Sequence, residues 1–110
     1  MSLNDYQREV DEWASKFDPK YWPALQQFAR LAEETGEVAR VLNHIYGHKK
    51  LKPDEAQREL GGELSDVLFT LICMANSHGI NLDEEWKKMM DKLNSRDANR
   101  FKPSDLNPKI

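Results

Sequence analysis

Apolar residues recur every three or four positions along most of the chain, which is the period of amphipathic α-helices. This pattern predicts a helix over residues 3–16, a second from Pro23 to about Gly47, a third from Pro53 with Gly79 as its C-terminal cap, and a fourth with Asp83 as its N-cap. No segment alternates apolar and polar residues with a period of two, so no sheet is expected. Short connections between the helices favour an all-α, antiparallel bundle of about four main helices.

The predicted third helix changes character along its length. Its first half is polar, whereas residues 64–75 are nearly all apolar. A helix that is apolar on every side is normally buried on every side, and a chain of 110 residues buries only a modest core by itself. We therefore expect a homo-oligomer, either a dimer or a tetramer.

Composition and charge narrow the classes of function. The net charge of −3 gives no basic signature of nucleic-acid binding, and no apolar run approaches the roughly 20 residues that cross a membrane. Cys73 is the single cysteine, so an intrachain disulfide is excluded and a reducing, cytoplasmic location is expected. Residues 1–110 fit a single domain, with an irregular tail from about residue 99.

Two clusters of carboxylates stand out on the predicted helices. The second helix carries Glu33, Glu34 and Glu37, and the third carries Glu59, Glu63 and Asp66. At about 100° per residue the three acids of the third helix fall within an arc of roughly 60°. Like charges on one helix face repel one another, and a divalent cation with oxygen ligands, such as Mg²⁺, would reverse that effect.

The residues alone leave two interpretations of these clusters open. Charged runs on helices are usually solvated, and Glu37 lies nearly opposite the apolar stripe that contains Phe28, Leu31 and Leu42. Asp66, however, lies inside the most apolar stretch of the chain, where a buried carboxylate without a partner would be costly. We expect Asp66 to be buried and to face a metal ion, an arginine or a lysine.

The order and spacing of the acidic residues resemble the MazG-like nucleotide pyrophosphohydrolases, part of the all-α NTP pyrophosphohydrolase superfamily. The family pattern is Glu-Glu-x-x-Glu, a variable spacer, then Glu-x-x-Asp. Here Glu33-Glu34-Thr35-Gly36-Glu37 is followed by 25 residues and then by Glu63-Leu64-Ser65-Asp66. The resemblance covers roughly residues 22–96, and it rests on both motifs together.

The resemblance implies an activity and a set of site residues. The family hydrolyses nucleoside triphosphates to the monophosphate and pyrophosphate, which would suit a house-cleaning role in the nucleotide pool. It implies Mg²⁺, which Mn²⁺ can replace, bound by Glu34, Glu37, Glu63 and Asp66. Glu33 would be a catalytic supporting carboxylate, or the base that orients the attacking water. Family members are dimers or tetramers.

Further residues are candidates for contact with the substrate. The stretch that contains Lys92, Asn94 and Arg96 resembles a C-terminal segment that lies near the phosphates in the family, although cations are common at a helix end in any case. Trp22 and Phe17 are candidates for stacking on a base, with packing of the N-terminal segment as the alternative. His44 and His48 are four residues apart, but no third ligand is evident nearby, so zinc is not expected.

Two alternative functions remain at this level. One is a related enzyme of the same superfamily, specific for dUTP, dCTP or phosphoribosyl-ATP, which would share the acidic helices. The other is a non-catalytic helical module for oligomerisation or partner binding, which the wide apolar surface of the third helix would serve.

Overall fold

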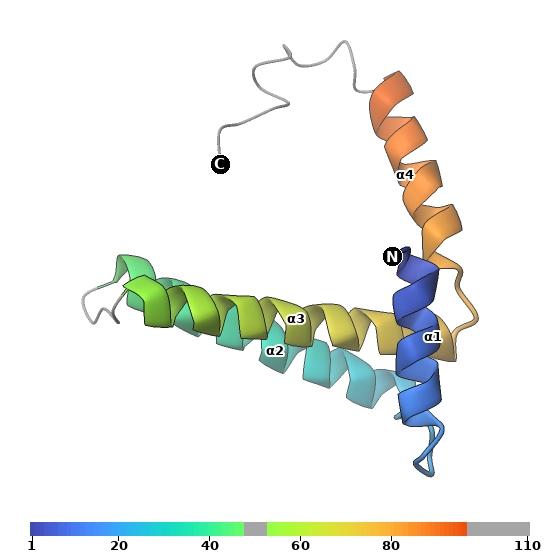
Figure 1. Ribbon diagram of the computed structural model, residues 1–110, viewed down its shortest axis with the longest axis horizontal. Helices are drawn as coiled ribbons and strands as arrows, with labels where there is room; N and C mark the ends of the chain where they lie inside the picture. The colour runs from blue at the N-terminus through green and yellow to red at the C-terminus, as the bar shows by residue number, and fades with distance from the viewer. Residues whose placement is uncertain (48–52, 97–110) are drawn as a thin grey trace.

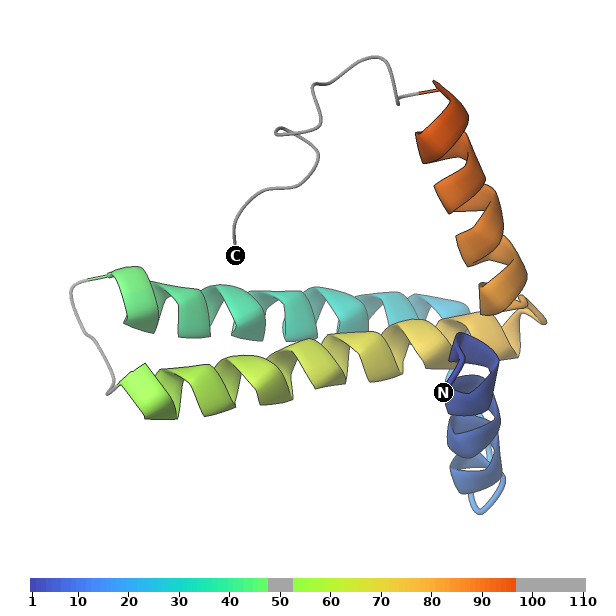
Figure 2. The same cartoon turned by 45° about the horizontal axis from the view of Figure 1, so that its top comes forward.

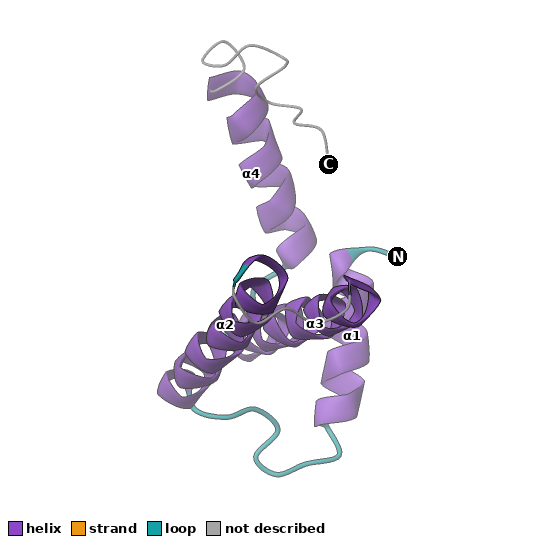
Figure 3. Ribbon diagram, turned by 90° about the vertical axis from the view of Figure 1, so that its left-hand side faces the viewer, coloured by secondary structure: helices purple, strands orange, loops and turns teal. Residues whose placement is uncertain are grey.

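Four α-helices make up most of the structure. The computed structural model describes residues 1–47 and 53–96, and its helices are α1 (Leu3–Ala14), α2 (Ala24–Tyr46), α3 (Pro53–Ser77) and α4 (Leu82–Arg96). No strand occurs among the described residues (Figure 3). The predicted all-α class is therefore confirmed. Helix α3 begins at Pro53 as predicted, α1 ends two residues early, and the predicted tail from about residue 99 lies outside the described residues.

Helices α2 and α3 form a long antiparallel hairpin that organises the molecule (Figures 1 and 2). Helix α1 lies across the end of this hairpin where α2 begins and α3 ends. Helix α4 contacts α1 and projects away from the hairpin. The arrangement leaves one long side of the hairpin open along much of its length.

The seam between α2 and α3 contains polar residues. The buried positions of α2 are Gln27, Glu34 and Val41, which are seven residues apart and so lie on one face. The position of Glu37 nearly opposite the apolar stripe implies instead that this stripe faces inward. That prediction is wrong for the single chain, because Phe28 is 63% exposed and Leu25 is 84% exposed. The inner face of α2 thus carries a carboxylate, and its apolar stripe faces outward.

Helix α3 also leaves much of its apolar surface uncovered. Leu64, Leu68 and Leu71 share one face and are exposed, while Ile72 and Ala75 are buried against the other helices. The expectation that residues 64–75 are buried on every side is therefore wrong for the single chain, because the three other described helices cover only part of α3. None of the described helices is both long and apolar enough to cross a membrane.

The turn between α3 and α4 closes with specific hydrogen bonds. Gly79 has a φ of 66°, the Ile80 N–H donates to the Ala75 carbonyl at 2.9 Å, and the Gly79 N–H donates to the Asn76 carbonyl at 3.2 Å. This pattern is a Schellman motif, so the predicted cap at Gly79 is confirmed. It lets α4 leave α3 in a fixed direction.

The predicted N-cap at Asp83 is wrong. Asn81 caps α4, since its Oδ1 accepts a hydrogen bond from the Glu84 N–H at 3.1 Å. Asp83 lies in the first turn of α4, and its carboxylate accepts hydrogen bonds from the N–H groups of Leu3 and Asn4 at 3.0 and 3.3 Å. Free amides at the start of α1 are satisfied by a residue nearly eighty positions away, and this pairing ties α4 to α1.

Replacing Gly79 by alanine is expected to lower the free energy of unfolding by about 1–2 kcal/mol, because a side chain in the left-handed region clashes with its own backbone. A Cβ at this position would meet no other atom within 4 Å, so the cost comes from the backbone alone. Gly79→Asn is the control, since asparagine tolerates this conformation. Urea unfolding should rank the three proteins Gly, Asn, Ala; equal stability of all three would contradict the motif.

Candidate functional site

Three carboxylates meet in the middle of the hairpin. One oxygen each of Glu34, Glu63 and Asp66 lies within 4.8 Å of the other two. Glu63 and Asp66 are three residues apart on α3, so they share the face that approaches Glu34 on α2. Mg²⁺ binds its ligands at about 2.0–2.1 Å, which places opposite ligands about 4.2 Å apart. The three oxygens therefore need only small side-chain rotations to fit one such ion.

The three carboxylates differ in burial. The prediction that Asp66 is buried is wrong for the single chain: Asp66 is exposed, Glu63 is half-buried and Glu34 is buried. The exposed side of α3 at Asp66 explains the difference, since no described helix covers it. No ion pair or side-chain hydrogen bond joins the Asp66 carboxylate to another of the described residues, which leaves its oxygens available to a metal ion.

Two arginines on α2 partly neutralise the cluster. Arg30 approaches Glu34, with Nη2 at 2.9 Å from Oε1, and its Nη1 lies 3.7 Å from Glu33. Arg40 donates from Nε to Glu37 at 2.8 Å and lies 3.8 Å from Glu63. Arg40 thus holds Glu37 beside the three carboxylates, and Glu33 lies exposed next to Arg30.

The cluster has an electrostatic cost that shows at Glu63. Partial removal from water raises the pKa of this carboxyl, and the negative charges of Glu37, Asp66 and Glu34 raise it further, while Arg40 opposes them. A group whose pKa is raised in this way favours the neutral form. A divalent cation among these oxygens would remove that penalty.

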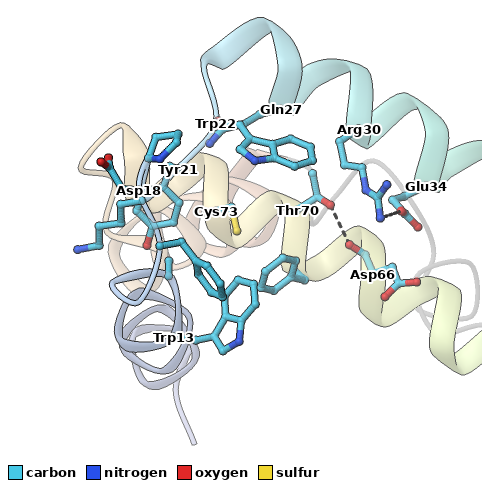
Figure 4. A pocket seen from close by; sticks show the side chains of 15 residues that line it. Trp13, Asp18, Tyr21, Trp22, Gln27, Arg30, Glu34, Asp66, Thr70 and Cys73 are labelled. Atoms are coloured by element: carbon cyan, nitrogen blue, oxygen red, sulfur yellow. Dashed lines mark hydrogen bonds and ion pairs between the residues drawn. The ribbon is translucent and has the colours of Figure 1, made fainter.

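A cavity of about 480 Å³ opens beside the carboxylates. We call it the aromatic cavity. Figure 4 shows Arg30, Glu34 and Asp66 gathered at one end of it and Trp13 and Tyr21 at the other. The Trp13 ring packs against those of Phe17 and Phe69, with centroids 4.9 and 5.6 Å apart. The volume suits a small ligand, and the lining would offer flat apolar surfaces at one end and charged groups at the other.

The outer wall of the aromatic cavity is the segment 15–23 between α1 and α2. Tyr21 donates from its hydroxyl to Asp11 at 2.7 Å and accepts a hydrogen bond from Asn76 at 3.0 Å. Burial and the hydrogen bond to Asp11 raise the pKa of Tyr21 to about 12, so the hydroxyl keeps its proton at neutral pH. Lys20 adds an ion pair with Asp11 at 2.9 Å. The wall is thus fastened to both α1 and α3.

The structure does not bring every predicted site residue to the carboxylates and the aromatic cavity. Trp22 lines the aromatic cavity, as do Glu34 and Asp66. Lys92, Asn94 and Arg96 lie exposed on α4, which projects away from the hairpin, and none of them lines the cavity within one chain (Figure 1).

Some residues of the site were missed by the sequence analysis. Arg30 is four residues before Glu34, and Arg40 is three after Glu37, so the ordinary spacing of ion pairs on a helix would have found both. Trp13 and Phe69 come together only because α1 crosses α3, and nothing local in the sequence signals that contact.

The all-α fold, the cluster of carboxylates and the cavity beside it fit a metal-dependent enzyme that acts on nucleotides. Comparison with known proteins gives the family. Residues 24–101 match the model of the MazG nucleotide pyrophosphohydrolase domain, so the chain belongs to that family.

Individual relatives are similar over nearly the whole chain. The Bacillus subtilis (strain 168) protein YpjD, described as uncharacterized, is 43% identical over 100 residues, which is 91% of this chain and 90% of YpjD. The B. subtilis protein YvdC, also described as uncharacterized, is 28% identical over 80% of this chain and 92% of its own length.

Two solved structures have the same fold. One is the Bacillus-conserved MazG protein, described as a nucleotide pyrophosphohydrolase, with a TM-score of 0.75 and 42% identity over 87% of this chain and 93% of that one. The other is YpjD of B. subtilis, with a TM-score of 0.78 and 42% identity over 86% of this chain and 97% of that one.

Proposed function

We propose that the protein hydrolyses nucleoside or deoxynucleoside triphosphates to the monophosphate and pyrophosphate, with Mg²⁺ as the metal and Mn²⁺ as a substitute. One observation carries the proposal: the carboxylates of Glu34 and Asp66 lie at one end of a cavity whose other end is aromatic, and a Glu63 oxygen lies within 4.8 Å of theirs. A nucleotide has the same polarity, with a charged phosphate chain at one end and a flat base at the other.

Each part of the site has a role in this reaction. Glu34, Glu63 and Asp66 would hold Mg²⁺, and Glu37 is the fourth proposed ligand once Arg40 releases it. Such an ion, when bound, neutralises charge on phosphate oxygens and orients the attacking water. Glu33 is the proposed carboxylate outside the ligand set, either as the base for that water or as its support. Trp22 and the rings around Trp13 would hold the base by stacking.

A homo-oligomer, a dimer or a dimer of dimers, is part of the proposal. The uncovered apolar residues on α2 and α3 support it, since each fully buried Leu or Phe side chain contributes about 1.5–3 kcal/mol. A second chain would also give Lys92, Asn94 and Arg96 a route to the phosphates, because α4 projects outward from its own hairpin. A cytoplasmic location and a single domain over residues 1–110 complete the proposal, the former resting on the single cysteine.

A substrate panel tests the proposed activity. The eight common ribo- and deoxyribonucleoside triphosphates, dUTP and phosphoribosyl-ATP would be incubated with the protein and Mg²⁺ or Mn²⁺ at pH 7 to 9, with detection of pyrophosphate. Metal-dependent release from at least one substrate is expected. If none is released, and if Mg²⁺ with a non-hydrolysable triphosphate also fails to raise the melting temperature, a non-catalytic module is the better account. A ligand at a hundredfold excess over Kd should stabilise by about 2.7 kcal/mol.

Replacing Trp22 by alanine is expected to raise KM about tenfold and to change kcat little, because stacking of a base on an aromatic ring contributes about 1–3 kcal/mol to binding. Trp22 is half-exposed, so the fold should survive. Trp86→Ala on α4 is the matched control, since Trp86 is equally exposed and does not line the aromatic cavity. Equal KM values for the two variants would show that Trp22 does not bind the base.

A further inference from the structure

Arg30 lies where the aromatic cavity meets the carboxylates. Its side chain is half-exposed, it lines the cavity, and its Nη2 lies 2.9 Å from the Oε1 of Glu34 (Figure 4). It also lines a shallower hollow outside Trp22, on the side of Glu33. The guanidinium thus stands between the aromatic rings and the cluster of acids, in the stretch that the phosphate chain of a bound nucleotide would cross.

Among the described residues that line the aromatic cavity, the other cationic side chain is Lys20. Lys20 lies at the aromatic end and is paired with Asp11 at 2.9 Å. Arg40 neutralises the same acid cluster but lines neither hollow. Arg30 is therefore the cation placed to meet phosphates at the acidic end of the cavity.

We propose that Arg30 is a phosphate-binding residue that exchanges its carboxylate partner for the phosphates of the substrate when metal and nucleotide bind. The proposal rests on the proposed function. In the metal-free protein the guanidinium offsets the charge of the buried Glu34. When a divalent cation takes the oxygens of Glu34, Glu63 and Asp66, two positive groups compete for Glu34 and repel each other at close range.

In the cavity, the guanidinium of Arg30 could pair with phosphate oxygens instead of with Glu34. A guanidinium has five N–H donors in a flat fork that matches phosphate oxygens in pairs. The side chain is long and half-exposed, so it can turn into the cavity without disturbing the packing of α2 against α3. Lysine would keep the charge but lose the paired geometry, so Arg30→Lys should fall between the wild type and an uncharged variant.

Binding of inorganic pyrophosphate tests the proposal without any choice of base. Calorimetry with saturating Mg²⁺ would compare the wild type with Arg30→Gln and Arg30→Lys, and with Arg8→Gln on the surface of α1 as an inert control. Arg30→Gln should weaken pyrophosphate binding roughly 10–100-fold, the worth of a charge-assisted hydrogen bond. Arg30→Lys should lose less, and Arg8→Gln should bind as the wild type does.

Electron paramagnetic resonance with Mn²⁺ alone supplies the second measurement. Because Arg30 competes with the metal for Glu34, Arg30→Gln should bind Mn²⁺ at least as tightly as the wild type. If Mn²⁺ and pyrophosphate binding fall by the same factor, Arg30 acts only through Glu34 and the proposal is overturned. Unchanged pyrophosphate binding of Arg30→Gln, with a lower melting temperature, overturns the proposal as well. If Arg30→Gln does not fold, the pyrophosphate affinity of Arg30→Lys, which keeps the ion pair with Glu34, is the deciding measurement.

The outcome separates this proposal from the proposed function. A wild-type protein that releases pyrophosphate from nucleotides, but whose pyrophosphate affinity does not depend on Arg30, keeps its function and loses only the role of Arg30. A wild-type protein that binds neither Mn²⁺ nor pyrophosphate contradicts both.

Discussion

Asp66→Asn is expected to lower the rate of pyrophosphate release about 10²–10³-fold while the metal-free protein stays as stable as the wild type or becomes more stable. The substitution keeps the shape of the side chain but removes one charge and one good ligand for Mg²⁺. Loss of one well-placed electrostatic contact in a transition state typically costs a factor of this size. The charge on the phosphates would then be less well neutralised.

The stability part of this expectation follows from the surroundings of Asp66. The carboxylate is exposed, lies within 4.8 Å of Glu34 and Glu63, and has no cationic partner among the described residues. Its charge contributes to the raised pKa of Glu63. Removing it should therefore relieve repulsion above the pKa of Glu63, where that carboxyl is ionised, and should matter little at acid pH where the carboxyl is neutral.

The measurement is a pair of melting curves in EDTA at neutral pH, alongside the rate of pyrophosphate release. Glu9→Gln on the exposed surface of α1 is the control, since it removes one negative charge away from the site. A marked drop in the melting temperature of Asp66→Asn, with activity reduced only in proportion to the folded fraction, would show that Asp66 has a structural role.

A second large effect is expected at the apolar face of α3. The double variant Leu64→Glu/Leu68→Glu should convert the oligomer into a monomer of 12.8 kDa. Leu64 and Leu68 lie one turn apart on the exposed face, and two carboxylates there would have to lose their water on association. The single chain would lose little, because neither side chain is buried within it.

Sedimentation velocity at tens of micromolar protein would measure the mass. The control is Lys87→Glu/Lys88→Glu on α4. Both lysines are exposed, and the two substitutions reverse charge at positions outside the apolar face. A wild-type protein that is itself a monomer would contradict the oligomer directly. If the variant keeps the oligomeric mass of the wild type, the interface lies on another surface, such as the exposed apolar stripe of α2.

The sequence predicted the helices well, because the signals for them are local. The apolar period, Pro53 at the start of α3 and Gly79 at its end act over a few residues. The N-cap of α4 was misplaced by two positions because Asn81 and Asp83 are equally good cap residues in sequence. The contact of Asp83 with the start of α1 decided between them, and a contact over that separation has no local signal.

The candidate site was only partly predictable for a similar reason. The spacing within α2 and α3 predicted which carboxylates share a helix face, and Glu34, Glu63 and Asp66 do converge. The predicted burial of Asp66 is wrong for the single chain, because the apolar character of α3 does not indicate which neighbours cover it. The aromatic cavity depends on α1 crossing the hairpin and on the segment 15–23 folding over Trp13, both of which are tertiary arrangements.

The central claim is that these carboxylates support hydrolysis of a nucleoside triphosphate between the α- and β-phosphates. It is tested most directly by ³¹P nuclear magnetic resonance of the products formed with Mg²⁺ in ¹⁸O-labelled water, on the best substrate of the panel. We expect nucleoside monophosphate and pyrophosphate, with the label in the monophosphate, and no reaction in EDTA. Orthophosphate with nucleoside diphosphate as products, or turnover that persists in EDTA, would contradict the account.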